Sequence, residues 1–461
     1  MSWGTPDQVN RTAKILIDAG KASDPDEARH YLKTLVLQVA VGRRIEHDPA
    51  AQAALATVVN AGHRAYLGGV HVQLDANPTM TTGWVAGLTA AEMVASYGGQ
   101  IVDQLAADRP TLALGRPAEP TGSPLLHLTW RGWAGGVVQS ADSRLDGDGT
   151  APAGIMAAGL GVSETFQQQL GAAVPGRRDV GISLWRPNLD WQTDAAAGPA
   201  LQYLPASLWL LGLGHLGQAY AWTLGMLPYA TPREVQLGLM DFDRIVEGNT
   251  ATQLLVRASD ARHHKTRIVS AALEHRGFKT RIVERAFDEH FHPVIHASPA
   301  RNEPTIALAG FDDIVPRRQL SEAGFTHIVD AGLGAGPVEY LDMVLHSFPA
   351  PEDPATAFAG QPPHARPLPQ AYENEIARRA KAGIDETTAR CGMLDIAGVT
   401  VGAAFVGACA STLVIADILR LLHGGDDYSV ISLDLRNPAG IRAVPNSAPG
   451  EYPAPAYTFA S

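Results

Sequence analysis

Apolar residues recur along the chain with two spacings, and these predict helices and strands in alternation. Apolar positions three and four residues apart predict helices over 12–19 and 26–41. Further along the first half, short apolar runs predict strands at 65–74, 125–130, 135–139 and 179–185, and a segment of small residues predicts a helix over 151–170. The first half is therefore predicted to be an α/β unit.

The second half alternates more regularly. Its apolar runs predict strands at 207–211, 235–240, 280–284, 304–309, 326–330 and 430–435, with helices at 215–227, 262–276 and 314–323. A Pro-rich crossover at 348–369 leads into a polar helix predicted over 370–382. Strands separated by helices indicate an α/β fold with a Rossmann-like, doubly wound, mostly parallel sheet.

Length and composition divide the chain into two domains. A chain of 461 residues is long for one core, and two domains of about 200 residues each are typical. The segment 188–205, with its Ala, Gly and Pro residues, is the predicted linker. We predict one α/β domain over 1–200, a second over 201–440 with its Pro-rich crossover at 348–392, and an irregular tail over 441–461.

The segment 396–416 contains no charged residue and is long enough to span a bilayer. It is rich in Gly, Ala, Ser and Thr, however, and Asp395, Asp417 and Arg420 flank it closely. We interpret it as a buried strand or loop that leads into a central helix ending at 424–425, rather than as a membrane span.

Composition narrows the classes of function. The net charge of −11 argues against nucleic acid as the main partner. Two cysteines, Cys391 and Cys409, provide neither a disulfide framework nor a four-cysteine zinc site. The first residues lack the basic start and apolar core of a signal peptide, so a cytoplasmic protein is expected.

A glycine-rich turn separates the strand at 207–211 from the following helix. Gly212 allows a tight turn, Gly214 lets a phosphate approach the backbone, and Gly217 lets the helix pack closely on the strand. The amides at the start of the helix, at His215 and Leu216, together with the helix dipole, attract an anion. The turn alone predicts only that a nucleotide can bind. The first half carries no such turn followed by an acidic strand end.

A polar series follows the next strand, and it is more specific than the glycines. Its members are Asp241, Asp243, Asn249, Gln253, Arg257 and Lys265, and the later pair Asp312 and Arg317. With the glycine turn, this series resembles the ThiF/MoeB/ubiquitin-activating superfamily of adenylating enzymes, over roughly 205–436. That family carries Asp-x-Asp, then Ser-Asn-Leu-x-Arg-Gln, then a lysine, and later Asp-Asn-x-x-x-Arg.

The resemblance implies an activity, cofactors and partners. ATP would be used to adenylate the C-terminal carboxylate of a ubiquitin-like or sulfur-carrier protein, with a conjugating enzyme as a further partner and a homodimer as one arrangement. Asp241 would accept the ribose hydroxyls. Lys265 and Arg257 would hold phosphates, and Asp312 would hold magnesium directly or through water. Neither nucleic acid nor a membrane is an expected partner.

The chain departs from the family pattern at Thr252, where the family has an arginine that holds the triphosphate. Gly248 and Thr250 also replace the usual Ser and Leu. Arg257 could supply the missing charge, or an arginine could come from a second subunit or from the first half. The first half is compared architecturally with the inactive adenylation domain of two-domain ubiquitin-activating enzymes. Its candidate arginines are Arg131, Arg177, Arg178 and Arg186.

Cys391 lies where family members that transfer the activated carboxylate to sulfur keep their cysteine. Its neighbour Arg390 and a loop setting would favour the thiolate. The alternative is a buried structural thiol, which is also how we interpret Cys409 in its apolar helix.

Other interpretations of the same residues remain open. Asp241 and Asp243 could be turn residues, and Lys265 could belong to a solvated basic face at 263–267. A nicotinamide-dependent oxidoreductase would use the glycine turn and Asp241, but it leaves Asn249, Gln253, Lys265 and Asp312 without roles. A non-catalytic nucleotide-binding scaffold would follow if Thr252 abolished activity.

Overall fold

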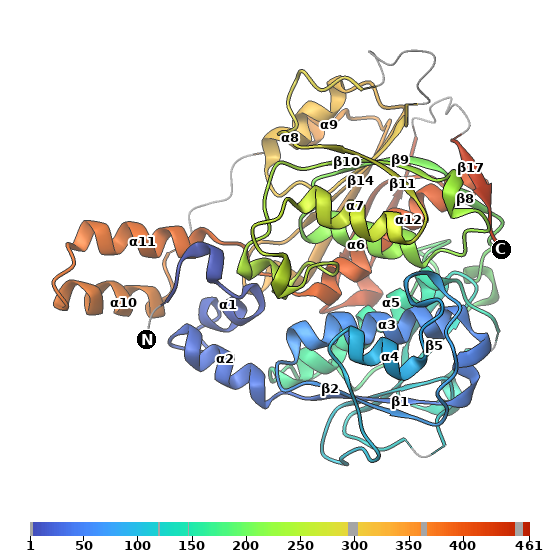
Figure 1. The fold of residues 1–461 in the computed structure, drawn as a ribbon, viewed down its shortest axis with the longest axis horizontal. Helices are drawn as coiled ribbons and strands as arrows, with labels where there is room; N and C mark the ends of the chain where they lie inside the picture. Colours follow the sequence, from blue (N-terminus) through green and yellow to red (C-terminus); the bar gives the residue numbers. More distant parts are fainter. Residues whose placement is uncertain (1–2, 119, 146, 294–302, 361–366, 448–454) are drawn as a thin grey trace.

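The computed structural model describes residues 3–118, 120–145, 147–293, 303–360, 367–447 and 455–461. Two sheets lie on opposite sides of a layer of helices (Figure 1). The described helices are α1 Arg11–Asp18, α2 Pro25–Thr34, α3 Pro49–Ala65, α4 Ala90–Ser96, α5 Ala151–Gln169, α6 His215–Met226, α7 Lys265–His275, α8 Ile314–Gln319, α9 Pro354–Ala357, α10 Gln370–Lys381, α11 Glu386–Gly398 and α12 Ala404–Leu422.

The strands of the first half, together with two strands that lie outside the main sheets, are β1 Leu37–Val41, β2 Val70–Leu74, β3 Gln100–Ile101, β4 Thr111–Leu114, β5 Leu125–Arg131, β6 Ala134–Val138, β7 Val180–Ser183, β8 Tyr203–Pro205 and β17 Tyr457–Phe459. Those of the second sheet are β9 Ser207–Leu211, β10 Gln236–Met240, β11 Lys279–Val283, β12 Ile306–Ala309, β13 His327–Leu333, β14 Asp342–Phe348, β15 Tyr428–Asp434 and β16 Arg442–Pro445.

The seven strands of the first sheet follow the same order as the first seven strands of the second, which has β16 as an eighth. The first runs β3-β2-β1-β4-β5-β6-β7, and the second runs β11-β10-β9-β12-β13-β14-β15-β16. In each sheet the first five strands of this order pair in parallel, and the remaining strands pair antiparallel. The predicted doubly wound, mostly parallel α/β fold is therefore confirmed. The first half repeats the topology of the second.

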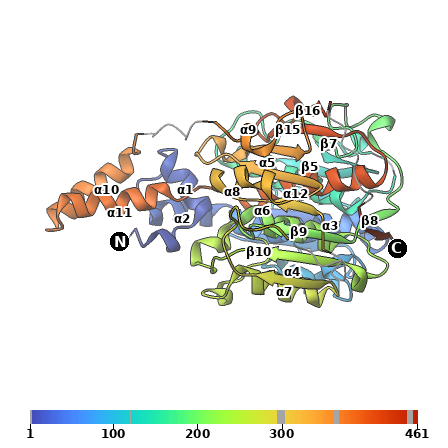
Figure 2. The same cartoon turned by 90° about the horizontal axis from the view of Figure 1, so that it is seen from above.

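At the centre of the layer between the sheets, α3 and α5 from the first half and α6 and α12 from the second pack against one another (Figures 1 and 2). Helix α12 is long and apolar enough to cross a membrane, but 89% of its most apolar window is buried inside the protein. Cys409 in α12 contacts α5, because a Cβ added at Gly159 would lie 2.4 Å from its Sγ. The apolar character of α12 therefore comes from its central place between the two halves.

Two sequence predictions are wrong in detail. The helix predicted over 26–41 ends at Thr34, and Leu37–Val41 is instead the buried central strand β1. The strand predicted from 65 begins only at Val70, because α3 continues to Ala65. A fully buried strand reads as a continuous apolar run, which spacing alone cannot distinguish from a helix.

The segments predicted to be irregular also contain strands. In the C-terminal tail, β16 pairs with β15 and β17 pairs with β8, which itself lies in the predicted linker. Residues 448–454 of that tail and 361–366 of the crossover lie outside the described residues. The segment 396–416 was expected to begin as a strand or loop that leads into the central helix. It begins instead within the last turn of α11, which ends at Gly398.

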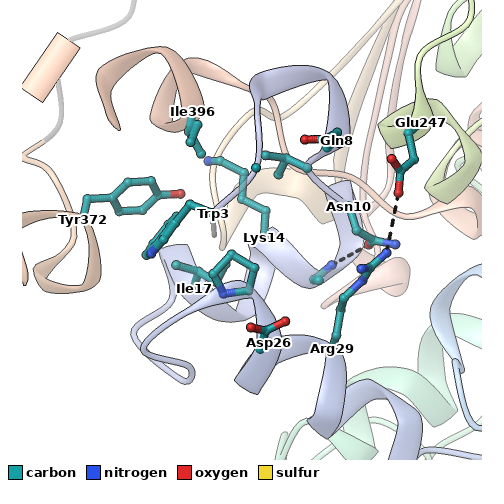
Figure 3. Close-up of a pocket in the computed structure, with 14 residues that line it drawn as sticks. Trp3, Gln8, Asn10, Lys14, Ile17, Asp26, Arg29, Glu247, Tyr372 and Ile396 are labelled. Carbon is teal, nitrogen blue, oxygen red and sulfur yellow. Dashed lines mark hydrogen bonds and ion pairs between the residues drawn. The ribbon is translucent and has the colours of Figure 1, made fainter. Parts of the chain in front are cut away.

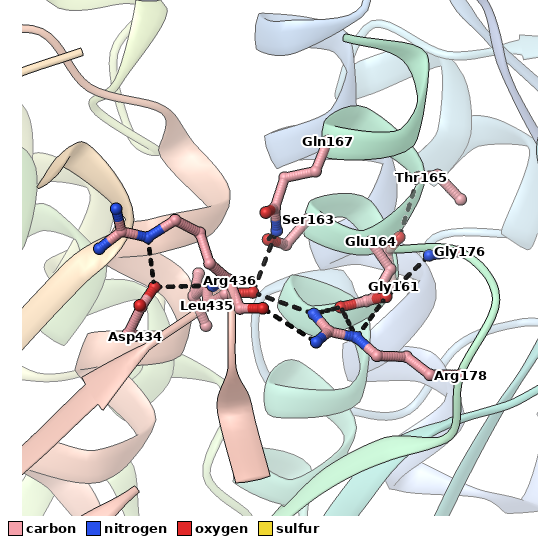
Figure 4. A network of polar contacts seen from close by, with 10 residues as sticks. All are labelled: Gly161, Ser163, Glu164, Thr165, Gln167, Gly176, Arg178, Asp434, Leu435 and Arg436. Carbon is pink, nitrogen blue, oxygen red and sulfur yellow. Dashed lines mark hydrogen bonds and ion pairs between the residues drawn. The ribbon is translucent and has the colours of Figure 1, made fainter. Parts of the chain in front are cut away.

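A polar network joins the two halves at the end of β15 (Figure 4). Arg178 Nη2 lies 2.6 Å from Oε1 of the buried Glu164, and its Nη1 donates to the Arg436 carbonyl at 2.9 Å. Gln167 donates to the Leu435 carbonyl at 3.1 Å. These bonds satisfy backbone carbonyls that follow the strand, so they fix the first half against the second.

Candidate nucleotide-binding site

The glycine turn leaves the start of α6 open. Gly212 has a φ of +78°, which favours glycine, and a Cβ at Gly217 would lie 1.9 Å from the Gly212 carbonyl oxygen. Gly214 is the N-cap of α6 and provides no side-chain cap. No atom lies within 4 Å of the position that its Cβ would occupy. The first amides of the helix are therefore available to an anion.

His215 and Leu216 open α6, and both were predicted to contribute to nucleotide binding. The His215 ring packs against α12, because a Cβ at Gly407 would lie 2.5 Å from its Nε2. Burial lowers the pKa of His215 to about 4, so the ring is neutral at pH 7. We infer that this residue can offer a nucleotide its backbone amide and not its side chain.

Asp241 connects the end of β10 to the glycine turn. Its Oδ2 accepts a hydrogen bond from the Leu213 amide at 2.6 Å, and its Oδ1 accepts one from the Asp243 amide at 2.7 Å. Burial raises the pKa of Asp241, and the positive charge of Lys265 opposes that shift. Asp241 therefore does more than close a local turn, since it sets the position of the glycine turn.

Lys265 lies at the start of α7 and points back toward the strand end. Its Nζ donates to Asp243 Oδ2 at 2.6 Å, and only 8% of the residue is exposed. Its backbone amide donates to the Asp243 carbonyl at 3.0 Å. The alternative of a solvated basic face therefore does not describe Lys265.

The segment that carries Asn249, Thr252 and Gln253 is buried beside the glycine turn. Asn249 Oδ1 accepts from the Val246 amide at 3.0 Å. Gln218 of α6 donates its Nε2 to Gln253 Oε1 at 2.6 Å and to the Leu213 carbonyl at 3.2 Å. Gln218 was not predicted as a site residue, although it directly follows Gly217 and lies on the helix that begins after the glycine turn.

Arg11, the first residue of α1, is a candidate site residue that the sequence did not single out, and its Nη1 donates to the Thr400 carbonyl at 3.4 Å. Burial lowers its pKa, and the negative charges of Asp312 and Asp7 oppose this shift. The helix start is attached to the segment after α11, because Thr12 Oγ1 donates to the Gly402 carbonyl at 3.0 Å. Arg11 and the exposed Asp312 thus lie within electrostatic reach of each other. Only its place one residue before the helix predicted over 12–19 could have pointed to it.

The arginines proposed from the sequence have other partners. Arg131 pairs with Asp194 at 2.9 Å, Arg178 with Glu164 at 2.6 Å and Arg186 with Asp426 at 3.4 Å, while Arg177 donates to the Ala173 carbonyl at 3.3 Å. Among the described contacts, these place the four arginines away from the glycine turn.

Arg257 and Arg317 also have defined surroundings. Arg257 is exposed, and its positive charge opposes the rise that burial causes in the pKa of Tyr97 in the first half. Arg317 Nε donates to Asp330 Oδ2 at 2.9 Å, which ties α8 to β13. Burial raises the pKa of Asp330 to about 6. Arg317 therefore has a structural partner, and the phosphate-binding role of Arg257 stays a prediction.

Cys391 lies in α11 and is exposed, whereas a loop was expected. The hairpin of α10 and α11 projects from the body beside α1 and α2 (Figures 1 and 2). Arg390 pairs with Glu373 of α10 at 3.0 Å, so its charge is balanced within the hairpin. Cys409 is buried, as predicted, and burial raises its pKa. Of the two thiols, only that of Cys391 is accessible.

A cavity of about 190 Å³ lies between α1, α2 and α10 (Figure 3). Beside it, the buried Lys14 donates to the Ala397 carbonyl at 3.1 Å, and Tyr372 donates to Asp18 Oδ1 at 2.6 Å. These contacts fix the cysteine-bearing hairpin against the helix that starts with Arg11.

No group of three or more His, Cys, Asp or Glu side chains that could hold a metal ion occurs within the described ranges. Asp312 offers one exposed carboxylate and lies two residues after Gly310, whose carbonyl oxygen is 3.1 Å from the position of a Cβ added at Gly212 in the glycine turn. This fits magnesium only in the manner typical of nucleotide sites, where one or two carboxylates bind the ion together with phosphate oxygens and water.

Family models cover most of both halves: the BilD N-terminal domain matches residues 36–184, and the BilD C-terminal domain matches residues 204–425. The bacterial E1-like protein BilD of Collimonas sp. (strain OK412) is 37% identical over 430 residues, which are 92% of this chain and 90% of that protein. The chain belongs to the BilD family. It is thus E1-like, as the resemblance to the ubiquitin-activating superfamily implied.

Solved structures of E. coli MccB resemble part of this BilD-family chain. MccB alone is 15% identical, over 54% of this chain and 64% of MccB, with a TM-score of 0.34. MccB with AMPCPP and MccA is 14% identical, over 52% and 64% of the two chains, with a TM-score of 0.33. The matched region is thus a little under two thirds of MccB. Likeness at this level does not bear on activity.

Proposed function

We propose that this BilD-family protein uses ATP to adenylate the C-terminal carboxylate of a ubiquitin-like or sulfur-carrier protein. The observation that carries the proposal is the uncapped start of α6 at Gly214, with Asp241 and Lys265 on the adjoining strand end and helix. Membership of an E1-like family supports it.

In this reaction a carboxylate oxygen of the carrier forms a bond to the α-phosphorus of ATP, the bond to the β-phosphate breaks, and pyrophosphate leaves. The amides of α6 and the ammonium of Lys265 would neutralise negative charge on the phosphates. Asp241 would accept the ribose hydroxyls. Asp312 would hold magnesium, which when bound screens the phosphate charge.

Arg11 supports a solution to the missing family arginine at Thr252. It is half-buried, and the carboxylate that acts on its pKa most strongly is that of Asp312, the residue proposed to hold magnesium. In our proposal the guanidinium of Arg11 contacts the triphosphate and replaces the charge that Thr252 cannot provide. Arg11 precedes the first sheet, so the first half would supply it.

The proposal is tested by calorimetry with Mg-ATP and with NAD. We expect Mg-ATP to bind and NAD not to bind, because the site offers charge to a triphosphate at Lys265 and Arg11. Lys265→Ala should lose most of the affinity and stay folded, with a somewhat lower thermal midpoint without nucleotide because Asp243 loses its ion-pair partner. Binding of NAD but not of ATP would favour an oxidoreductase and would end the adenylation proposal.

A transfer step at Cys391 is the second part of the proposal. The thiolate would attack the acyl carbon of the adenylate, a C–S bond would form, and AMP would leave. The support is the exposure of Cys391, in contrast to the buried Cys409.

We expect Cys391→Ala to eliminate a reducible adduct with the cognate carrier and to leave ATP–pyrophosphate exchange nearly unchanged. Cys409→Ala is the matched control, since it should keep the adduct and lose only core packing. The measurement is intact-protein mass with and without a reducing agent. An adduct that persists in Cys391→Ala would show that this thiol is not the acceptor.

A further inference from the structure

Arg64 of α3 reaches from the first half into the segment that carries the predicted nucleotide-binding residues. It is 6% exposed, and it donates to three backbone carbonyls of the second half, at Thr250, at Leu254 (3.3 Å) and at Val256 (3.1 Å). Asn60, one turn earlier on α3, donates to the Leu254 carbonyl at 2.9 Å and accepts from Arg64 Nε at 3.2 Å.

The segment that Arg64 holds has little regular structure to fix it. A short 3₁₀ helix, Glu247–Ala251, is followed by irregular backbone up to Val256. From the other side, Gln218 accepts from the Leu255 amide at 3.2 Å. Buried carbonyls without partners are costly, so the position of this segment depends on the groups that bind them. Asn249, Thr252 and Gln253 lie within it.

We propose that Arg64 is a positioning residue for the nucleotide, through which the first half sets the ATP affinity of the second. It touches neither phosphate nor metal in this proposal, and it acts by holding the carbonyls on either side of Thr252 and Gln253. The inference rests on the proposed function, since it assumes that ATP is the ligand of the glycine turn.

The fork of the guanidinium is essential to this role. Its planar donors reach carbonyls at three positions, whereas an ammonium is a point charge that cannot span them. Burial lowers the pKa of Arg64 only to about 10, so it is a cation at neutral pH. Among its described contacts there is no carboxylate, and its partners are carbonyl oxygens and Asn60. A lysine would therefore keep the charge and lose the geometry.

Arg178 is a matched control. It also belongs to the first half and donates to backbone carbonyls of the second, but these lie at Leu435 and Arg436, after β15 (Figure 4). Removing either arginine frees buried carbonyls at the interface and should destabilise the protein. Only the loss of Arg64 should affect the nucleotide.

The experiment measures the Kd for Mg-ATP by calorimetry and the thermal midpoint for the full-length wild type, Arg64→Lys, Arg64→Gln and Arg178→Gln. We expect both Arg64 variants to raise the Kd for Mg-ATP on the order of tenfold or more, because the segment that carries Thr252 and Gln253 would no longer be held in place. Arg178→Gln should lower the midpoint and leave the Kd within about twofold of wild type. If the Arg64 variants do not fold, Asn60→Ala, which removes one of the carbonyl contacts, should show a smaller rise.

Wild-type affinity in the foldable variants at Arg64 or Asn60 would overturn this inference and leave the proposed function standing. An equal rise in Kd for Arg178→Gln would also overturn it, because the effect would then be general loosening of the interface. If wild-type protein does not bind Mg-ATP, the proposed function fails, and this inference fails with it.

Discussion

Helices α3 and α6 follow equivalent strands in the two halves, yet their N-termini differ. In the second half the N-cap of α6 is Gly214, which has no side chain. In the first half the N-cap of α3 is Asp48, whose Oδ1 accepts from the Ala51 amide at 3.0 Å while its Oδ2 accepts from Trp130 Nε1 at 3.1 Å. One helix start is open to an anion, and the other is already occupied by a carboxylate.

The strand ends differ in a related way. Asp75 follows β2 as Asp241 follows β10, so the first half carries an acidic strand end without the glycine turn that precedes it in the second half. Asp75 accepts from the Ala118 amide at 2.8 Å, whereas Asp241 accepts from the glycine turn itself. Shared topology therefore does not give shared chemistry, because binding depends on which groups the acid and the helix start leave free.

The largest expected effect comes from giving the second half the cap of the first. Gly214→Asp places a carboxylate at the start of α6, where it would take the amides and repel a triphosphate. We expect Mg-ATP affinity to fall on the order of a hundredfold or more, since charge repulsion and lost hydrogen bonds act together. Calorimetry measures the loss.

Gly214→Ala is the control for bulk, because open space surrounds the position that its Cβ would occupy. It should lower the affinity less than Gly214→Asp does, because it adds bulk where the phosphate would approach the backbone but adds no charge. The unfolding free energy of Gly214→Asp should stay near that of wild type or rise by a few tenths of a kcal/mol, since Asp is a good N-cap. Tight ATP binding by Gly214→Asp would show that the phosphates lie elsewhere and that the comparison of helix starts is misleading.

A smaller effect tests whether the N-terminal part lends charge to the second half. Arg11→Ala should lower carrier-dependent ATP–pyrophosphate exchange on the order of a hundredfold, as expected for a preorganised charge at the transition state. Arg257→Ala, on the exposed side near Tyr97, is the comparison. If Arg257→Ala has the larger effect, the second half supplies its own arginine and the two halves are less dependent on each other.

Sequence patterns predicted the parts of the fold and site that are local. The strand at 207–211 and the helix starting at His215 agree with the structure, because a buried run, a glycine turn and a helix follow one another directly. Asp241 and Lys265 were identified through the resemblance to the adenylating superfamily, and the structure brings both to the same strand end.

The long-range parts of the site could not be predicted. Arg11 and Arg64 meet residues distant in the sequence, at Thr400 and Thr250, only once α1 and α3 are packed. Nothing in the neighbourhood of Arg64 in the sequence distinguishes it from any other polar residue on a helix. For the same reason β1 was predicted to be helix, since only its buried place at the centre of a sheet shows what its apolar run is.

The smallest expected effect concerns the closed helix start of the first half. Asp48→Ala removes the N-cap of α3 and the partner of Trp130, so the free energy of unfolding should fall by about 1 kcal/mol, within the usual range for a lost cap. Mg-ATP affinity and a stoichiometry of one per chain should not change, because emptying the cap does not create the glycine turn that the first half lacks. Thr150→Ala, at the N-cap of α5, is a matched control without the charge, and it should cost less because a carboxylate also interacts with the helix dipole. Denaturant unfolding and calorimetry measure the two quantities. If Asp48→Ala binds a second ATP, the carboxylate of Asp48 alone prevents nucleotide binding at the start of α3. The first half would then contain a second nucleotide site that its own N-cap blocks, and it would not be only a structural support for the second half.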